Sequence, residues 1–489
     1  MDEIRFVDTT LRDGHQSLWA ERMTTGMMLP VAERIDNAGY EAIEILSGSH
    51  IKKSVRELRE DPWERVRRVA KRITRTPLRV IAGRVNTFGF DPPVMYQLFL
   101  DRMAANGVRQ GRISEPWNDL PGWTRRTDAV RKAGLEPIIN LIYSVSPRHT
   151  DEYYARCTRD AVSLKVPRLC LKDPGGLLTP ARMRTLVPTI FANAGGTPVE
   201  LHSHCTTGLG PLNALEAMKL GIRTVNTAIP PLSDSASLPS VFNVARNARA
   251  LGYAPRVDED MIRPVSDHFM FVARHEGLPV GAPVEYDEAQ YRHQIPGGMI
   301  SNLGHQLALV GLADRFAEAL EETVRVRADL GYPIMVTPLS QFVGSQAAIN
   351  VILGERYREV SDQVIRYALG QYGAEGAEGM DQDVRARILD RPRTRDLAGW
   401  EEPDPSLTEM RRELGAGNVS DEELLLRWLL GPEEIAAMRA AGKATPYLSA
   451  RQPLVALVAE IAKRTGFSQL RLQRPGFSLI MEKRAAPQG

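Results

Sequence analysis

Short strand-like runs recur through the first half of the chain at intervals of about 30 residues, and most gaps between them hold an amphipathic helical pattern. These runs are IRFVD (4–8), EAIEIL (41–46), LRVIAG (78–83), GRIS (111–114), PIINLIY (137–143), RLCLK (168–172), PVELH (198–202) and TVNTAI (224–229). Eight strand–helix units in succession predict an α/β fold of the (β/α)8, or TIM, barrel type. An open doubly wound sheet is the alternative, but no glycine-rich dinucleotide fingerprint follows the first strand.

The pattern changes after about residue 255, where long helical stretches replace the alternation. We therefore expect a barrel domain at 1–255, a helical funnel at 256–375 that completes the site, and a mainly helical C-terminal extension at 376–489. Charge, glycine and proline are frequent at 375–420, which indicates an exposed connection. Three further segments stand out: a turn in QIPGGMISN (294–302), a helical PLVALVAEIAKRTG (453–466) and a strand-like RLQRPGFSLIMEKR (471–484).

Composition narrows the class of protein. The 489 residues are 43% hydrophobic, and 62 basic side chains balance 60 acidic ones to a net charge of +2. This balance argues against nucleic acid or an anionic membrane surface as a partner. No apolar stretch approaches the ~20 residues of a membrane span. The polar N-terminus is unlike a signal peptide, and the three cysteines form no CxxC pair, so we expect a cytoplasmic protein.

Polar side chains stand where several predicted strands end. Asp13 follows the first strand, Lys172 ends the sixth, and His202 and His204 end the seventh. Active sites of such barrels gather at these carboxyl ends. The two histidines, at positions i and i+2 on a strand, would point the same way and could bind one metal ion. A lysine becomes a metal ligand only as its carbamate, and the residues alone favour the alternative of a salt bridge from Lys172 to Asp173 or Asp13.

Several segments, in order along the chain, resemble the carboxyltransferase component of biotin-dependent enzymes, namely oxaloacetate decarboxylase alpha subunits, pyruvate carboxylase and the pyruvate-acting transcarboxylase subunit. These segments are DTTLRDGHQSLWA (8–20), DPWERVRRV (61–69), SPRHT (146–150), LCLKDPGGLLTP (169–180), HSHCTTG (202–208), QIPGGMISNL (294–303) and VTPLSQFVGSQAAINVILGERY (336–357). Together they make a specific signal, although no single segment would suffice.

The resemblance implies a set of site residues and a chemistry. It assigns a divalent metal (zinc, manganese or cobalt) to four ligands: Asp13, His202, His204 and a Lys172 carbamate formed with CO2. It places Arg12 and Gln16 at the substrate oxygens, with Arg12 steadying an enolate. It makes Thr337 the proton shuttle between carboxybiotin and the substrate. A cation near a developing enolate is physically sound for carboxyl transfer next to a carbonyl.

The sequence departs from the family pattern around the acceptor. The family segments WGGATFD, RGxNxxGY, RVFDALND and DTA correspond here to LSGSHIK (46–52), GRVNTFGF (83–90), RISEPWND (112–119) and NTA (226–228). The family arginine that contacts the pyruvate carboxylate is replaced by Gly83, and Arg84 would point to the opposite face of a continuing strand. We expect a rebuilt acceptor pocket that includes Lys52, Arg84, Phe90 and Glu115, with Lys52 and Arg84 reading any anionic group.

One segment imitates a biotin attachment site. EAMKL (216–220) resembles the AMKM type, but it belongs to an amphipathic helical pattern that ends at Gly221 rather than to a hairpin of a small β domain. We therefore expect no biotinyl domain and no biotin on Lys219. Biotin would arrive on a separate carrier, which makes biotin carboxyl carrier and biotin carboxylase subunits the expected partners of a homodimer.

The leading hypothesis is a carboxyltransferase that moves CO2 between carboxybiotin and a small carbonyl acceptor. Three alternatives stay open: an oxaloacetate decarboxylase or pyruvate carboxylase subunit proper, a metal-dependent aldolase or lyase of the wider superfamily, and a non-catalytic scaffold subunit. The lysine at the sixth strand and the VTPLSQFVG segment favour carboxyl transfer over the lyases. The complete set of four metal ligands argues against a scaffold.

Overall fold

The computed structural model describes residues 1–86, 91–295, 311–400, 402–445, 469–474 and 477–482, and the single positions 307, 447, 458 and 461. Eight parallel strands form a closed barrel in sequence order, because β1 pairs with both β8 and β2. The strands are β1 Glu3–Asp8, β2 Ala42–Leu46, β3 Leu78–Ala82, β4 Val108–Ile113, β5 Glu136–Ile142, β6 Arg168–Asp173, β7 Val199–Ser203 and β8 Thr224–Thr227. The predicted barrel fold is confirmed, with each strand within a few residues of its expected place.

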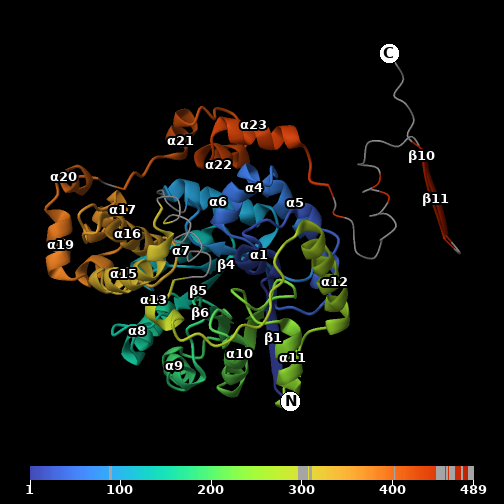
Figure 1. The fold of residues 1–489 in the computed structure, drawn as a ribbon, viewed down its shortest axis with the longest axis horizontal. Coiled ribbons are helices and arrows are strands. Elements are labelled where there is room, and N and C mark those ends of the chain that lie inside the picture. The colour runs from blue at the N-terminus through green and yellow to red at the C-terminus, as the bar shows by residue number, and fades with distance from the viewer. Residues whose placement is uncertain are drawn as a thin grey trace.

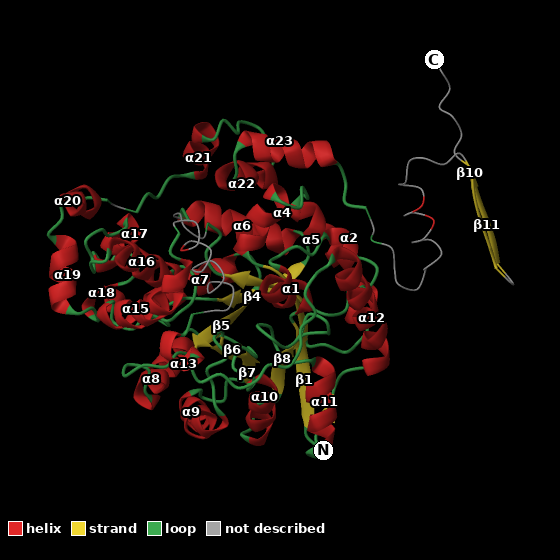
Figure 2. Ribbon diagram, in the orientation of Figure 1, coloured by secondary structure: helices red, strands yellow, loops and turns green. Residues whose placement is uncertain are grey.

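Helices surround the barrel (Figure 2). They are η1 Thr10–Gly14, α1 His15–Trp19, α2 Thr25–Met28, α3 Ala32–Asp36, α4 Gly48–Arg56, α5 Pro62–Ala70, α6 Pro93–Ala105, α7 Leu120–Lys132, α8 Asp151–Ser163, α9 Pro180–Asn193, α10 Gly210–Lys219 and α11 Val241–Ala250. Local sequence explains several starts: the Asp61, Thr150 and Thr179 side chains each accept a hydrogen bond from a first-turn N–H. Pro62 and Pro180 occupy the first helical position, where no N–H is required.

The helical region after the barrel forms a second lobe with its own core. Its elements are α13 Gln290–His293, η2 Ala313–Arg315, α15 Phe316–Asp329, α16 Leu339–Leu353, α17 Asp362–Ala368, α18 Ala374–Glu378, α19 Gln382–Leu389 and α20 Pro392–Ala398. Ile388 and Leu397 are buried in this core. The charged segment 375–420 is therefore helical for most of its length, and the expectation of an exposed connection holds near residues 402–406 and at most positions of 415–420.

The chain then returns to the barrel (Figure 1). Helices α21 Leu407–Glu413, α22 Asp421–Leu429 and α23 Pro432–Ala441 join the barrel's core, as does α12 Glu259–Glu276. The Glu422 carboxylate on α22 lies 2.6 Å from Nη1 of Arg67 and 3.1 Å from Nη2 of Arg102 on the outer helices. The two cores thus divide the chain at about 290 and 400 rather than at the predicted 255 and 375, because packing and not composition decides the boundary.

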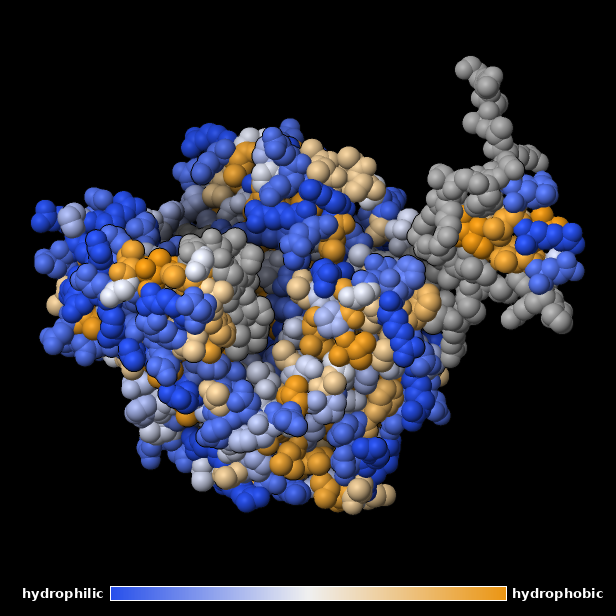
Figure 3. Space-filling view, viewed as in Figure 1, coloured by the Kyte–Doolittle hydropathy of each residue, from blue (hydrophilic) through white to orange (hydrophobic). Residues whose placement is uncertain are grey.

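Two more strand features complete the fold. Strand β9, Ala254–Pro255, pairs with the start of β1. Strands β10 Gln469–Arg474 and β11 Phe477–Glu482 pair antiparallel within the segment that the sequence predicts as strand-like, and in Figure 1 this pair lies apart from the two lobes. The predicted turn at 294–302 and helix at 453–466 fall mostly outside the described residues. Figure 3 shows a largely hydrophilic face, and no helix of the described chain is long and apolar enough to cross a bilayer.

Charged side chains fill part of the barrel's interior. Glu44, Arg79, Arg112 and Glu200 are all fully buried. Nη1 of Arg79 lies 2.6 Å from Oε1 of Glu200, and Nη2 of Arg112 lies 3.0 Å from Oε1 of Glu44. Buried charges are tolerated only when they are paired, as these four are. The network lies between β2, β3, β4 and β7 and supports the polar groups at the ends of these strands.

Candidate metal site and substrate cavity

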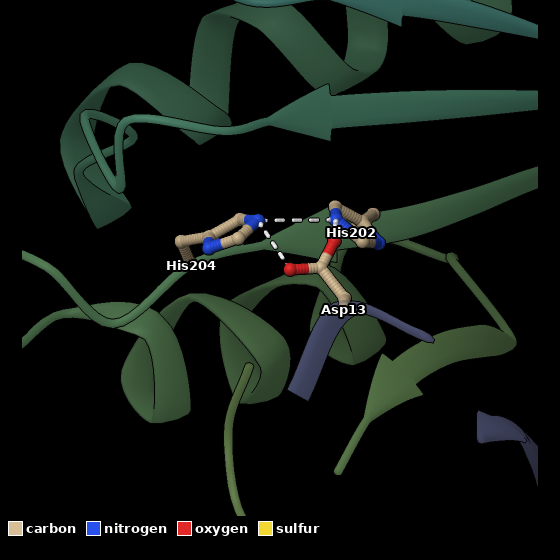
Figure 4. Close-up of side chains that lie close together, drawn as sticks. All are labelled: Asp13, His202 and His204. Carbon is tan, nitrogen blue, oxygen red and sulfur yellow. Dashed lines mark hydrogen bonds and ion pairs between the residues drawn. The ribbon is translucent and has the colours of Figure 1, made fainter. Parts of the chain in front are cut away.

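Asp13, His202 and His204 meet at the carboxyl end of the barrel (Figure 4). The Nε2 atoms of His202 and His204 are 3.3 Å apart, and they lie 3.3 Å and 3.6 Å from the two Asp13 oxygens. Ligand atoms bound to zinc at ~2.1 Å with tetrahedral angles are roughly 3.4 Å apart. The spacing of the three side chains therefore fits a single divalent cation, as the strand-end pattern predicts.

The backbone explains this convergence. After β1 the chain enters the one-turn π-helix η1, which turns Arg12 and Asp13 over the barrel mouth. Such turns often occur at functional sites. His202 is the last residue but one of β7 and His204 lies two residues on, just past the strand, so both imidazoles project from the same side of the sheet. Elements far apart in sequence thus supply one nitrogen-and-oxygen ligand set.

Hydrogen bonds fix how the two imidazoles present their nitrogens. Nδ1 of His204 lies 2.7 Å from the Ala236 carbonyl, which only accepts, so Nδ1 carries the proton and Nε2 a lone pair. Nδ1 of His202 lies 3.0 Å from Oδ1 of Asn226, an oxygen that also accepts from Nη1 of Arg112 at 2.9 Å. Nη1 of Arg112 also lies 3.1 Å from this Nδ1, so the contact to Asn226 and the contact to Arg112 favour different tautomers of His202. In the tautomer that donates Nδ1–H to Asn226, both Nε2 lone pairs face each other and the Asp13 carboxylate. Two nitrogen lone pairs and one carboxylate are the kind of donor set that a divalent cation binds.

Lys172 lines the cavity beside these ligands. It is the register partner of His202 across β6 and β7. Its ammonium makes no salt bridge to Asp13, to Asp173 or to any other residue that the structure describes, and Asp173 instead accepts from the N–H groups of Leu177 and Leu178. Burial, followed by the Arg112 and Arg12 charges, lowers the pKa of Lys172 to about 8. The salt-bridge alternative thus lacks its contact, and a neutral amine is the form that reacts with CO2.

Arg12 is held in place by two carboxylates. Its Nη2 lies 2.5 Å from Oε2 of Glu44 and its Nη1 lies 2.6 Å from Oδ2 of Asp13. Nη1 also donates weakly to Oε1 of Gln16 at 3.4 Å. Burial opposes the Asp13 charge, but the Arg12 guanidinium and His204 hold the pKa of Asp13 well below its usual range. Arg12 and Gln16 both line the cavity, so their predicted place beside a substrate is consistent with the geometry.

A cavity of about 610 Å³ opens above these residues. The barrel forms its floor and walls, and residues 335–337, 340 and 341 of the helical lobe complete it. Thr337 is among them, at an exposed position where solvent or a second molecule can reach its hydroxyl. Residues of the helical lobe thus contribute to the cavity.

Comparison with known proteins assigns the family. A model described as "Conserved carboxylase domain" matches residues 291–457, and one described as "HMGL-like" matches residues 124–268. The B subunit of pyruvate carboxylase from Methanocaldococcus jannaschii is 34% identical over 456 residues, which cover 91% of this chain and 79% of that protein. The methylmalonyl-CoA carboxyltransferase 5S subunit of Propionibacterium freudenreichii is 31% identical and covers 87% of this chain and 85% of that one. The chain belongs to the carboxyltransferases of biotin-dependent carboxylases.

The fold of this carboxyltransferase is also that of a solved structure. The carboxyl transferase domain of Rhizobium etli pyruvate carboxylase superimposes with a TM-score of 0.81 at 22% identity, covering 99% of this chain and 84% of that one. The relatives of 34% and 31% identity confirm the resemblance inferred from the sequence motifs and, with it, the enzyme class. The predicted roles of individual side chains remain proposals.

The predicted acceptor-pocket residues of the carboxyltransferase are not all brought together. Arg84 lines the cavity because β3 ends at Ala82, so strict alternation no longer governs it, and its guanidinium lies 5.4 Å above the Tyr372 ring. Lys52 is turned away: its Nζ donates to Oδ1 of Asn86 at 2.6 Å, and Lys53, one residue on around α4, lines the cavity instead.

Glu115 likewise does not line the cavity of the carboxyltransferase. Its Oε2 accepts from Nε of Arg126 at 3.3 Å, so the side chain is directed at α7. Ser114 and Pro116, its neighbours in sequence, line the cavity in its place. Phe90 lies outside the described residues.

Sequence reasoning missed the residues that orient the ligands. Asn226 stands out only as a departure from the family motif, and nothing in the sequence links it to His202. Arg112 and Glu44 read as ordinary strand residues, although the fold brings both beneath the metal site. A charged residue at an inward position of a predicted barrel strand is the one signal that would have identified them.

Proposed function

We propose that this carboxyltransferase moves CO2 between carboxybiotin, presented by a separate carrier, and a small carbonyl acceptor that reacts as its enolate. The observation that carries the proposal is the convergence of Asp13, His202, His204 and Lys172, beside Arg12, at the floor of one cavity. Family membership supports the same chemistry, because 34% identity extends over 91% of the chain.

The proposed metal ligands are Asp13, His202, His204 and a Lys172 carbamate. Imidazole and carboxylate donors suit zinc, manganese and cobalt alike. A divalent ion bound there supplies positive charge that stabilises negative charge on a carbonyl oxygen. The lowered pKa of Lys172 supports the carbamate, because a larger fraction of the amine is neutral near pH 7 than at an ordinary lysine.

The chain's own residues then have distinct roles. Arg12 and Gln16 donate hydrogen bonds to the acceptor oxygens, and the two carboxylates on Arg12 keep its guanidinium in position. Thr337 carries a proton from the acceptor carbon toward the biotin ring nitrogen. In that direction the N–CO2 bond of carboxybiotin breaks, the acceptor loses its C–H proton, and a new C–CO2 bond forms at that carbon. Seating of the biotin ring above Thr337 would exclude water from this exposed hydroxyl.

The acceptor is proposed to differ from pyruvate and oxaloacetate. Gly83 stands on the cavity wall where the family resemblance expects a carboxylate-binding arginine, and Lys52 points away from the cavity. Arg84 lines this wall, with its guanidinium 5.4 Å from the centre of the Tyr372 ring, and it is the residue proposed to contact an anionic group of the acceptor.

The partners are proposed to be a biotin carboxyl carrier protein and a biotin carboxylase subunit, with the chain itself as a homodimer. The Methanocaldococcus jannaschii relative is named as one subunit of a pyruvate carboxylase, which is consistent with a multi-subunit enzyme. Lys219 is the lysine of the EAMKL segment that resembles a biotin attachment site. It ends helix α10, and its Nζ lies 3.5 Å from Oε2 of Glu216. A lysine on a helix supports delivery of biotin by another chain.

One experiment tests the proposed function. The purified protein is loaded with metal and given carboxylated carrier protein, and loss of carboxybiotin is followed with and without a panel of ketones and 2-oxo acids. Acceptor-dependent loss that Thr337→Ala abolishes is the expected result. Thr224→Ala is the matched control, because Thr224 lies at the amino end of β8, away from the cavity. Turnover of an acceptor without biotin would favour the lyase alternative, to which the HMGL-like match lends support.

A further inference from the structure

Glu21 places a carboxylate on the wall of the substrate cavity. It follows helix α1, eight residues beyond Asp13, and its side chain is 13% exposed. Glu21 has a φ of 63° and Ala20 a φ of 48°, a conformation that side-chain-bearing residues adopt infrequently. Two such residues in succession at a cavity indicate a turn that is maintained for what it positions.

No positively charged side chain among the described residues pairs with the Glu21 carboxylate. Its Oε1 accepts from Oγ of Ser49 at 2.7 Å. Within the described residues, His50 is the basic side chain nearest to it, with Nδ1 3.9 Å from Oε1. Burial lowers the pKa of His50, so this imidazole is neutral near pH 7 and does not compensate the carboxylate charge. Oε2 accepts no hydrogen bond from any described residue.

The side chains around Glu21 leave its carboxylate available to accept a hydrogen bond from a ligand. Ser49 lies 3.0 Å from Oγ of Ser47, which in turn lies 2.7 Å from Nδ1 of His50. This chain of hydroxyls starts at the N-terminal end of α4, and Ser47 and Ser49 both line the cavity. Lys53, the cavity lysine on the same helix, is 2.5 Å from Oε1 of Glu57 and is therefore engaged elsewhere.

A carboxylate that can only accept hydrogen bonds selects among ligands. It attracts N–H groups and repels a second carboxylate, most strongly where water is partly excluded. A site with a buried acceptor also rejects a ligand that lacks the matching donor, because the acceptor is then left unpaired.

We infer that Glu21 is a specificity-determining residue for the acceptor, and that the acceptor is a small carbonyl compound bearing an N–H donor, such as an amide, ureido or ammonium group. This inference rests on the proposed function, because it takes the cavity as the place where the acceptor binds. It adds the chemical class of the group that the acceptor presents to the cavity wall at Glu21.

Three nearly isosteric ketones test the inference: acetoacetamide, acetoacetate and methyl acetoacetate. They differ only in the terminal group, which is an amide, a carboxylate or an ester. Binding to the metal-loaded protein is measured by titration calorimetry, which requires no turnover. We expect acetoacetamide to bind at least about tenfold more tightly than acetoacetate, which corresponds to one charge-assisted hydrogen bond, with the ester in between.

Two variants make the test specific. Glu21→Gln keeps the size of the side chain and removes its charge, so the ratio of the two dissociation constants should fall toward one, chiefly because acetoacetate gains affinity. Glu33→Gln, on an exposed face of α3, should keep the wild-type ratio. A Glu21→Gln protein that keeps full metal content and its melting temperature excludes misfolding as the cause.

Several outcomes would overturn the inference. Acetoacetate binding as tightly as acetoacetamide, an unchanged ratio in Glu21→Gln, or no measurable binding of any of the three compounds would each do so. Failure of the proposed function is separately visible, because carboxybiotin would then be stable in the presence of every acceptor while these binding ratios could still be measured.

Discussion

Lys172 is the residue on which the metal chemistry most depends. Its amine lines the cavity without an ion pair to any described residue, and its pKa is lowered to about 8. We expect Lys172→Ala to lose most of its bound metal, because an anionic ligand is removed from a site of four. Metal content by mass spectrometry after exhaustive dialysis is the measurement, with Lys71→Ala on the surface as the control. Full metal occupancy in Lys172→Ala would assign Lys172 a structural role.

Asn226 is predicted to act through His202. Asn226→Leu removes the acceptor for the His202 Nδ1–H and should weaken metal binding by roughly 10- to 100-fold. Asn226→Asp keeps an oxygen that accepts from both His202 and Arg112, and it should bind metal with nearly wild-type affinity. Competition with a chelating dye measures both. Equal affinities for the Leu and Asp variants would mean that Asn226 does not orient the ligand.

The strand-end pattern predicts that Asp13, His202 and His204 lie together, and they do, because parallel strands in a closed barrel share one edge and these positions can be placed by counting. Side chains beyond the strand ends cannot be placed by counting residues along a strand. The phase of α4 decides between Lys52 and Lys53, and an ion pair with Arg126 turns Glu115 away. Neither the helix phase nor the partner can be read from sequence alone.

At the scale of elements, the end of β3 controls the acceptor wall. A Cβ on Gly83 would meet its nearest neighbour, Cβ of Ser114, at an ordinary 3.7 Å, so a larger side chain fits there. We expect the wild-type protein to bind pyruvate weakly and Gly83→Arg to bind it roughly 10- to 100-fold more tightly, which corresponds to about 1.5–3 kcal/mol for a charge-assisted pair.

Calorimetric titration of pyruvate into the metal-loaded proteins measures this gain. Gly83→Met, of similar length but uncharged, is the matched control and should show no gain. Tight pyruvate binding by the wild-type protein, or an equal gain in Gly83→Met, would show that the wall already contains a pyruvate site. The enzyme would then be a conventional pyruvate-type subunit.

At the scale of the whole molecule, the buried charge network links barrel stability to pH. Burial alone would raise the pKa of Glu44, but the Arg112 and Arg12 guanidiniums outweigh it and lower the pKa to about 2. Because the folded-state pKa is below the ordinary value of 4.5, the stabilisation is complete above about pH 4.5. It is lost as the pH falls toward 2, and it amounts to about 3 kcal/mol.

Glu44→Gln should therefore lower the free energy of unfolding at pH 7 by about 3–5 kcal/mol, since two arginines lose a buried partner. The difference from the wild type should shrink between pH 4.5 and pH 2. Urea denaturation followed by circular dichroism across this range is the measurement. Glu285→Gln, in an exposed loop, should match the wild type throughout. A pH-independent difference would show that Glu44 contributes through shape rather than charge.

The return of the chain to the barrel after the helical lobe has a practical consequence. Residues 402–404 are exposed, whereas Leu425 is buried in the barrel's core and the Tyr447 N–H donates to the Gly26 carbonyl at 2.9 Å. Side-chain and backbone contacts, rather than the covalent connection through residues 402–404, therefore hold the C-terminal segment on the barrel. The molecule can be divided as a split protein: pieces 1–404 and 405–489, expressed together with one tag, should be purified as a pair, and Leu425→Asp in the smaller piece should separate them.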